Sequence, residues 1–315
     1  MRKIMFTAAL VTVLAGFCVL PTACGRRDGR PRVALIMKAL NNEFFKTMED
    51  GAKAHQRANS SQYELLSTGI SIETEVDKQS GLVDQMIAQR VDAIVLTPAD
   101  SKQLVLPAKR ALDANIVVVN IDNKLDADTM KKVGVKIPFV GPDNAKGARK
   151  VADYLVTKLN KGDKVAIIDG MPGTYNAEQR HKGFEQSMRD AGMQIVASQT
   201  AEWDTAKAER VVANILPGQP DLKAVLCAND LMAEGAAAAV EAAGKSKQIL
   251  VVGFDNTTAA QVLIRAGKML ATADQHADRQ AVWGIEYALA ILEKKAQPED
   301  KETEVDLITA ESLRK

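Results

Sequence analysis

Apolar runs of strand length alternate with longer amphipathic segments from residue 33 to residue 294. Most of the runs are β-branched and apolar throughout, which is typical of strands covered on both faces. This alternation predicts βαβ units and therefore an α/β fold with parallel sheets. The predicted strands are 33–37, 63–68, 93–97, 116–121, 165–168, 194–197, 224–227, 249–254 and 269–273.

The segments between these runs have the length and the apolar periodicity of helices. In segment 73–89 the apolar residues recur at helical spacing, so Asp77, Lys78 and Gln79 are expected to face solvent. The predicted helices are 44–57, 73–89, 102–114, 145–159, 177–191, 205–215, 231–243 and 279–294.

The alternation falls into two similar blocks, from residue 33 to about 122 and from about 164 to 254. Segment 133–144 contains Pro138, Gly141 and Pro142, which resist a central strand, so it is predicted to cross between two lobes. Residues 269–315 are too few for a third domain and are expected to complete both lobes. The chain would then pass between the lobes several times, and these crossings would form a hinge. The predicted division is 33–141 plus 276–303 for the N-terminal lobe and 142–275 plus 304–315 for the C-terminal lobe.

The first 24 residues have the pattern of a secretory signal, followed by a linker at 25–32. Arg2 and Lys3 precede an uncharged run from 4 to 20 that ends at Pro21. A transmembrane anchor is the alternative, but 17 residues are short for a span of about 20. We therefore expect export to the periplasm or cell envelope.

Residues 20–25 resemble a bacterial lipobox, in which a cysteine is lipidated after cleavage. Leu20 lies four residues before Cys24, where the usual leucine lies three before. Lipidation of Cys24 and ordinary cleavage near Ala23 are both left open.

The charge balance and the cysteine count exclude several classes of protein. Lys and Arg total 41 against 40 Asp and Glu, so no overall field attracts nucleic acid or anionic lipid. The three cysteines and three histidines are scattered and form no CxxC, so no disulfide framework, metal site or cofactor is expected. Cys227 lies in an apolar run and is predicted to be a buried, unreactive thiol.

Polar side chains repeatedly follow the predicted strands at their carboxyl ends. In an open parallel sheet ligands bind at this edge, because loops and helix N-termini there present unpaired donors. These residues are Lys38, Asn41, Asn42, Asn120, Asp122, Asn123, Lys124, Asp169, Asn229, Asp230, Asp255, Asn256 and Gln275.

A single Asn or Asp after a strand is often only a turn former or a helix cap, and Asp230 is interpreted as such a cap. The repetition in both blocks favours a ligand site instead. Phe44 and Phe45 begin a helix, where we expect one ring in the core and the other at a cleft. Trp203 stands between Glu202 and Asp204, a setting that predicts a partly exposed stacking surface.

This set of side chains suits an uncharged polyhydroxylated molecule. Each sugar hydroxyl donates and accepts, and a planar carboxylate, amide or guanidinium can engage two neighbouring hydroxyls. Aromatic faces cover the C–H surfaces of a sugar ring. A hydroxyl of altered stereochemistry leaves buried groups unpaired, at a cost of ~1–3 kcal/mol each.

At these residues the sequence resembles the periplasmic sugar-binding proteins of ABC importers, in the ribose- and allose-binding branch of the type I fold. The motifs lie at 38–45, 120–124, 170–184, 201–204, 227–230, 251–255 and 271–275. The resemblance implies two doubly wound parallel-sheet lobes, joined by a hinge, that close on a monosaccharide. It also implies a monomer that docks on a membrane permease. The sugar contacts that it implies are Asn42, Phe44, Phe45 and Asp122 from the first lobe, Arg180, Trp203, Asn229 and Asp255 from the second, and Gln275 at the hinge.

One departure bears on the identity of the sugar. Ribose binders have an arginine after the strand-four aspartate, where this chain has Asn123, and Lys38 and Lys124 resemble the allose-type pattern. Lys38 and Asn123 are therefore included among the sugar-binding candidates. An allose-, psicose- or ribose-like sugar fits, and ordinary surface positions remain an alternative for the two lysines.

Three other classes of protein share features with this sequence. An enzyme is disfavoured because no GxSxG, P-loop or GxGxxG stands at a strand-to-helix turn, although Asp122 and Asp255 could form a glycosidase pair. A lac-repressor-type regulator would carry a helix-turn-helix where this chain has its leader. A sensor that presents its sugar to a chemoreceptor or histidine kinase differs only in partner and stays open.

Overall fold

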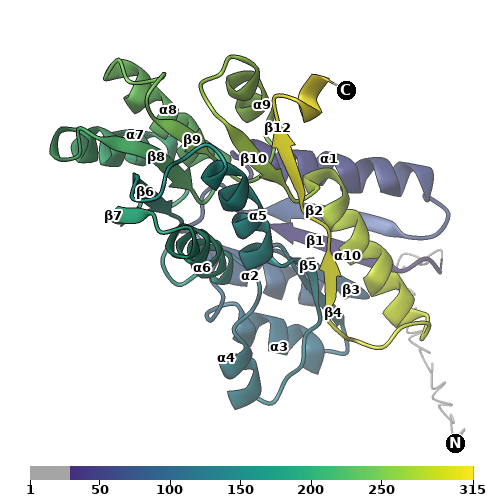
Figure 1. Cartoon of the computed structure of the whole chain (residues 1–315). Helices are drawn as coiled ribbons and strands as arrows, with labels where there is room; N and C mark the ends of the chain where they lie inside the picture. Colours follow the sequence, from purple (N-terminus) through teal and green to yellow (C-terminus); the bar gives the residue numbers. More distant parts are fainter. Residues whose placement is uncertain (1–28, 315) are drawn as a thin grey trace, which may run out of the picture. The chain divides into compact units, whose positions relative to one another are not determined.

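The computed structural model describes residues 29–314, and the chain from Pro31 onward forms one compact unit. This unit contains two six-stranded sheets with helices between successive strands (Figure 1). The predicted α/β fold with two doubly wound sheets is confirmed. The predicted signal segment 1–24, with Cys24, and residues 25–28 of the predicted linker lie outside the described residues.

The first sheet is wholly parallel, and its central strands β1, β3 and β4 are buried except at the first residue of β1 and of β4. Its strands are β1 (Arg32–Met37), β2 (Glu64–Gly69), β3 (Ala93–Leu96), β4 (Val117–Ile121), β5 (Phe139–Pro142) and β11 (Lys301–Thr303), in the order β11-β5-β4-β3-β1-β2.

The second sheet repeats this arrangement, except that its last strand runs antiparallel at one edge. Its strands are β6 (Lys164–Asp169), β7 (Gln194–Thr200), β8 (Leu222–Cys227), β9 (Leu250–Val252), β10 (Ala271–Asp274) and β12 (Asp306–Thr309), in the order β12-β10-β9-β8-β6-β7.

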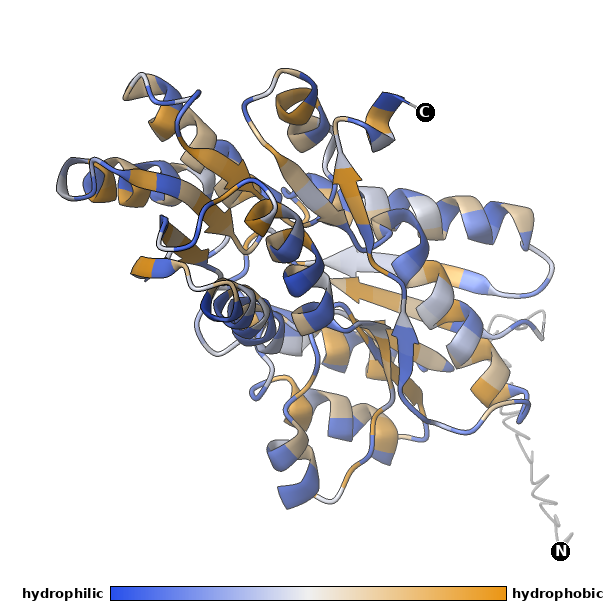
Figure 2. Cartoon of the chain, in the orientation of Figure 1, coloured by the Kyte–Doolittle hydropathy of each residue, from blue (hydrophilic) through white to orange (hydrophobic). Residues whose placement is uncertain are grey.

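Helices cover both faces of each sheet and bury its apolar side chains, so that hydrophobic residues concentrate along the strands (Figure 2). In the first lobe, α1 and α10 pack on one face, and α2 and α3 on the other. In the second, α5 packs with α6, and α7 packs with α8. The helices are α1 (Glu43–Ala58), α2 (Val76–Ala88), α3 (Val105–Asp113), α4 (Ala127–Lys132), α5 (Asn144–Val156), α6 (Tyr175–Asp190), α7 (Thr205–Ile215), α8 (Asp230–Ala242), α9 (Thr258–Arg265) and α10 (Ala277–Leu292), with short 3-10 turns at Leu216–Gly218 and Ser312–Arg314.

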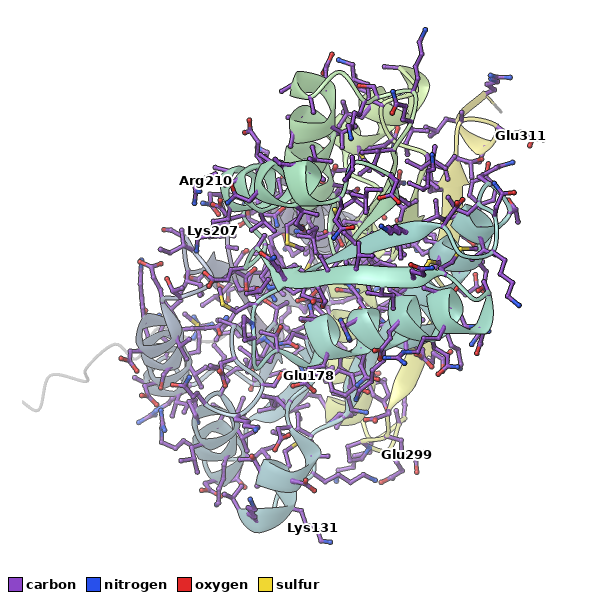
Figure 3. The ribbon with its side chains drawn as sticks, turned by 60° about the vertical axis from the view of Figure 1, so that its left-hand side comes forward. Lys131, Glu178, Lys207, Arg210, Glu299 and Glu311 are labelled. Atoms are coloured by element: carbon purple, nitrogen blue, oxygen red, sulfur yellow. The ribbon has the colours of Figure 1, made fainter. Side chains whose placement is uncertain are left out.

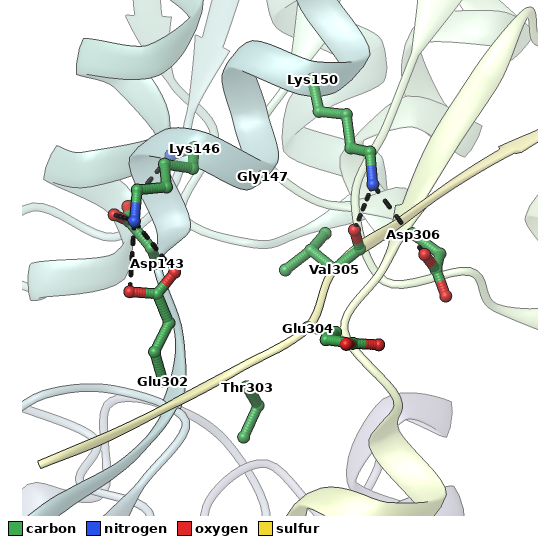
Figure 4. A pocket seen from close by; sticks show the side chains of 9 residues that line it. All are labelled: Asp143, Lys146, Gly147, Lys150, Glu302, Thr303, Glu304, Val305 and Asp306. Carbon is green, nitrogen blue, oxygen red and sulfur yellow. Dashed lines mark hydrogen bonds and ion pairs between the residues drawn. The ribbon is translucent and has the colours of Figure 1, made fainter.

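The described chain passes between the two sheets three times, after β5, after β10 and after β11. Figure 4 shows the third crossing, where α5 lies beside the segment from β11 to β12. Lys146 Nζ lies 3.0 Å from Glu302, and Lys150 Nζ donates to the carbonyl of Val305 at 2.7 Å. These contacts attach the crossing strand to the second lobe and form part of the expected hinge.

The structure differs from the sequence predictions at three points. The predicted crossover 133–144 contains β5, because its prolines flank the short strand or end it and leave Phe139 and Val140 free to pair with β4. The edge strands β11 and β12 and the short helices α4 and α9 were not predicted. Gln79 is fully buried rather than exposed, because its amide bonds to the carbonyls of Met37 and Thr97.

Long charged side chains of both signs extend from the surface of this unit. Figure 3 labels Lys131, Glu178, Lys207, Arg210, Glu299 and Glu311, all of them exposed. This mixture agrees with the nearly neutral net charge of the chain.

Candidate functional site

Residues from the carboxyl ends of both sheets line one cavity. Ten of the eleven predicted binding residues line it, and Asn123 does not. Those ten come from segments far apart in the sequence, and parallel strands bring them to a common edge. The lining residues are Lys38, Asn42, Phe44, Phe45, Glu73, Asp122, Asn176, Arg180, Trp203, Asn229, Asp255 and Gln275.

A buried group of three charges forms the first-lobe wall. Lys38 Nζ lies 3.2 Å from Glu73 Oε2 and 3.4 Å from Asp122 Oδ2. Burial opposes the charge on Lys38, but Glu73 and Asp122 outweigh it and raise the lysine pKa. Burial also raises the pKa of Glu73, against the influence of Lys38. Asp122 Oδ2 accepts no hydrogen bond from any described residue, so it can accept one from a ligand.

Arg180, one turn into α6, crosses the second-lobe wall and is 2% exposed. Its guanidinium donates to Asn144 Oδ1 and to the carbonyl of Ala228, both at 2.8 Å, and lies over the ring of Phe254. Its third polar neighbour is Asp255 Oδ1 at 3.5 Å. These contacts fix the plane of the guanidinium, which leaves little rotamer freedom to lose on binding a ligand.

Asp255 belongs to a chain of polar contacts that reaches the hinge. Its Oδ1 accepts from Gln275 Nε2 at 2.7 Å, and Gln275 Oε1 accepts from Gln280 of α10. Burial raises the pKa of Asp255 to about 8, although Arg180 opposes that shift. The chain therefore connects a second-lobe carboxyl to a first-lobe helix.

Aromatic rings close the cavity from both lobes. Phe44 and Phe45 are both buried and pack edge to face, with ring centroids 5.1 Å apart, so the expectation of one core ring and one cleft ring is too simple. Trp203 is 7% exposed, which contradicts the predicted partial exposure. Its indole lies against Gly170, where an added Cβ would stand 2.1 Å from the ring. Its Nε1 has no hydrogen-bond partner among residues 29–314.

Two asparagines serve as helix caps and also line the cavity. Asn42 Oδ1 accepts from the amide of Phe44 at the start of α1, and Asn229 Oδ1 accepts from Met232 at the start of α8. The cap interpretation of Asp230 is wrong. Asp230 is the first residue of α8, and its buried carboxylate accepts from Thr257 N and Thr272 Oγ1.

Asn123 lies behind the cavity wall and is fully buried. Its Nδ2 donates to the carbonyl of Pro98, and its Oδ1 accepts from Ser101 Oγ and from the amide of Asn176. These three hydrogen bonds hold the side chain away from the cavity, which Asp122, the preceding residue, lines. Lys124, also compared with the allose pattern, instead pairs with Asp300 at 2.5 Å.

Two lining residues, Glu73 and Asn176, were not identified from the sequence. Glu73 precedes α2 and looks like an ordinary acidic residue at the start of a helix, so no local pattern distinguishes it. Asn176 lies within the 170–184 motif, whose resemblance was a usable signal.

The backbone is strained at the cavity. Asp122, Trp203 and Asp255 have φ values of 61°, 64° and 127°, in the region that favours glycine. Such conformations cost of order 1–3 kcal/mol each and concentrate at functional sites. Their occurrence in three lining residues supports a binding role for this cavity.

The raised pKa values of three carboxyls in the second lobe predict how the stability of the fold depends on pH. Burial, as the largest cause, raises the pKa of Asp230 to about 6, of Glu234 to about 7 and of Asp255 to about 8. The unfolded chain releases these protons near pH 4, so the native state holds more protons between pH 5 and 8. We expect the free energy of unfolding to fall by at least ~1 kcal/mol over that range. Urea unfolding at several pH values measures this.

Glu234→Gln should make that pH dependence shallower, because it removes one of the three carboxyls. Glu209→Gln, at an exposed position of α7, is the matched control and should leave the slope unchanged. A stability that stays level or rises from pH 5 to 8 would contradict the raised pKa values.

Among the described residues, no group of three or more His, Cys, Asp and Glu side chains is arranged to hold a metal ion. Cys227 is buried, as predicted, and burial raises its thiol pKa. Within the same residues, no helix has the length and apolar character needed to cross a membrane.

Residues 33–296 match the family model described as a periplasmic binding protein domain. The chain belongs to this family. A D-ribose/D-allose-binding protein of Pseudomonas aeruginosa is 47% identical over 97% of both chains. The ribose import binding protein of Escherichia coli is 30% identical over 90% of this chain and 92% of that protein. A solved periplasmic solute-binding protein of an ABC transporter from Actinobacillus succinogenes, with bound D-allose, has a TM-score of 0.85 at 35% identity and covers 90% of this chain and 99% of that chain.

Proposed function

We propose that this periplasmic binding protein captures a monosaccharide between its two lobes and delivers it to the permease of an ABC transporter. The observation that carries the proposal is the shared cavity, which is lined by Asp122 from the first lobe and by Arg180 and Asp255 from the second. A ligand that contacts both lobes at once favours the closed arrangement over the open one.

The electrostatics of the cavity fit an uncharged ligand. Two buried cations, Lys38 and Arg180, face the carboxyls of Glu73, Asp122 and Asp255. The pKa of Asp255 is raised to about 8, which favours the neutral form of this carboxyl near neutral pH. The site therefore offers many donors and acceptors together with groups of both signs, an arrangement suited to an uncharged ligand.

The class of sugar follows from the relatives together with these residues. We assign an allose-, ribose- or psicose-like monosaccharide, because the named relatives bind D-allose or D-ribose and the cavity supplies several acceptors and donors for hydroxyls. Lys38 and Glu73 supply polar groups at one side of the cavity, where an additional hydroxyl of a hexose could bind.

Import is favoured over presentation of the sugar to a receptor. The relatives are named for import or for an ABC transporter, and family membership implies a periplasmic location after export of the chain. Lipidation of Cys24 remains a proposal about the same exported protein. We assign no catalytic activity to the protein, since the family consists of binding proteins. Recovery of unmodified sugar after long incubation with the protein would support this.

A thermal-shift screen tests the proposal, because a ligand that binds only the folded state raises Tm by mass action. At 100 times Kd the stabilisation is about 2.7 kcal/mol, which corresponds to a shift of several degrees. We expect D-allose, D-psicose or D-ribose to raise Tm, and sugar phosphates of similar size to do so less. Failure of every pentose, hexose and polyol to shift Tm would refute the function.

A further inference from the structure

The N-cap residue of helix α6, which carries Arg180, does not cap the helix with its side chain, and among the described residues the only cap from within the first turn is Asn176 Oδ1, which accepts from Ala177 N. The N-cap residue Thr174 accepts no hydrogen bond from the helix, and its hydroxyl donates to the carbonyl of Met171. The first two amides of α6 are bonded to the other lobe instead. Tyr175 N donates to Ser101 Oγ at 3.0 Å, and Asn176 N donates to Asn123 Oδ1 at 3.3 Å.

The two acceptors are held in place by their own lobe. Ser101 Oγ donates to Asn123 Oδ1 at 3.2 Å, and Asn123 Nδ2 donates to the carbonyl of Pro98 at 2.9 Å. Ser101 is 4% exposed and Asn123 is fully buried. First-lobe side chains thus perform the capping that a helix N-terminus normally receives from its own N-cap residue.

A second helix of the C-terminal lobe receives the same kind of contact. Thr258 N, the first amide of α9, donates to Glu43 Oε1 of α1 at 2.9 Å. In both places a side-chain oxygen of the first lobe accepts from the first turn of a second-lobe helix. A carboxylate at a helix N-terminus is also favoured by the helix dipole.

We propose that Ser101 and Asn123 form a closed-state latch on α6, defined as the bonds from Tyr175 N and Asn176 N to these two side chains. The proposal rests on the function above and deepens it. Neither Ser101 nor Asn123 lines the cavity, so both are positioning residues that act on the sugar through α6 and Arg180. This assigns a role to Asn123 that does not involve direct contact with the sugar.

The latch stabilises closure only moderately, because amides exposed by opening exchange their protein partners for water. The open and closed forms therefore stay close in free energy, and the sugar can shift the equilibrium. Since the latch makes no contact with the sugar, its loss should raise the Kd of every sugar by the same factor. A residue that contacts the sugar would instead change the affinities for different sugars unequally.

The test compares Ser101→Ala and the Ser101→Ala/Asn123→Ala pair with the unmodified protein by calorimetry with D-allose and with D-ribose. We expect Kd to rise about threefold for the single variant and about tenfold for the pair, or about 1.4 kcal/mol, by the same factor for each sugar bound. Sugar-free X-ray scattering should give a larger radius of gyration for the pair than for the unmodified protein.

Ser187→Ala is the matched control, because Ser187 Oγ is also buried but donates to Asp153 within the second lobe. It should lower Tm and leave Kd and scattering unchanged.

The latch would be overturned if the double variant raised Kd by different factors for the two sugars. An unchanged Kd together with unchanged scattering would also overturn it. If the unmodified protein binds no sugar, the proposed function fails and sugar-free scattering alone decides: a larger radius for the pair supports the latch, and an equal radius overturns it. If the pair does not fold, Ser101→Ala decides by the same criteria.

Discussion

Asp122→Ala should raise the Kd for the sugar by more than tenfold, over ~1.4 kcal/mol, and Asp255→Ala should do so from the opposite lobe. Each change removes a buried acceptor from the cavity. It also leaves a buried cation with one partner fewer, Lys38 in the first case and Arg180 in the second. Calorimetry of the two variants with the sugar that gives the largest thermal shift measures the effect.

Asp77→Ala is the control for the loss of a carboxylate from the first lobe, since Asp77 is exposed on α2. Its Kd should equal that of the unmodified protein. Asp122→Asn keeps the shape of the side chain and should retain more affinity than Asp122→Ala. An unchanged affinity in both alanine variants would remove the basis for a site shared by the two lobes.

Arg180→Met should cost both affinity and stability. The substitution keeps an apolar stem against Phe254 and removes the bonds to Asn144 and to the carbonyl of Ala228. Removing one partner of a buried ion pair typically costs 3–5 kcal/mol, and Asp255 can reduce this cost by staying protonated. We expect a stability loss of roughly 2–4 kcal/mol and a Kd raised by more than tenfold.

Arg189→Met, on the same helix, is the matched control for Arg180→Met. Arg189 pairs with Glu185 at the surface, where such pairs are worth about 0–1 kcal/mol. Its effects on urea unfolding and on Kd should both be small. If Arg180→Met were as well tolerated as Arg189→Met, the guanidinium would be neither a structural nor a binding element of the cavity.

The parallel sheets and most of the cavity could be predicted because their signals are local. A continuous apolar run such as 224–227 predicts a buried strand, and Asn229 directly after it lies at the ligand edge of the sheet. The edge strands β11 and β12 are only three and four residues long, and β11 is polar throughout, so their existence depends on partners distant in the sequence.

The remaining differences come from contacts that no local pattern encodes. Gln79 is on the polar side of its helix by periodicity, yet it is buried, and its amide donates to the carbonyls of Met37 and Thr97 at the ends of β1 and β3. Trp203 stands between charged residues, yet Gly170 provides the space that buries its ring. Asn123 follows a cavity residue directly, but its side chain is directed to the first turn of α6.

The most direct test of the central claim is a crystal structure of the protein with the sugar that gives the largest thermal shift. The claim predicts one monosaccharide enclosed by both lobes, with hydroxyls bonded to Asp122 on one side and to Asp255 or Arg180 on the other. A sugar held by one lobe alone, or bound away from these three residues, would contradict it.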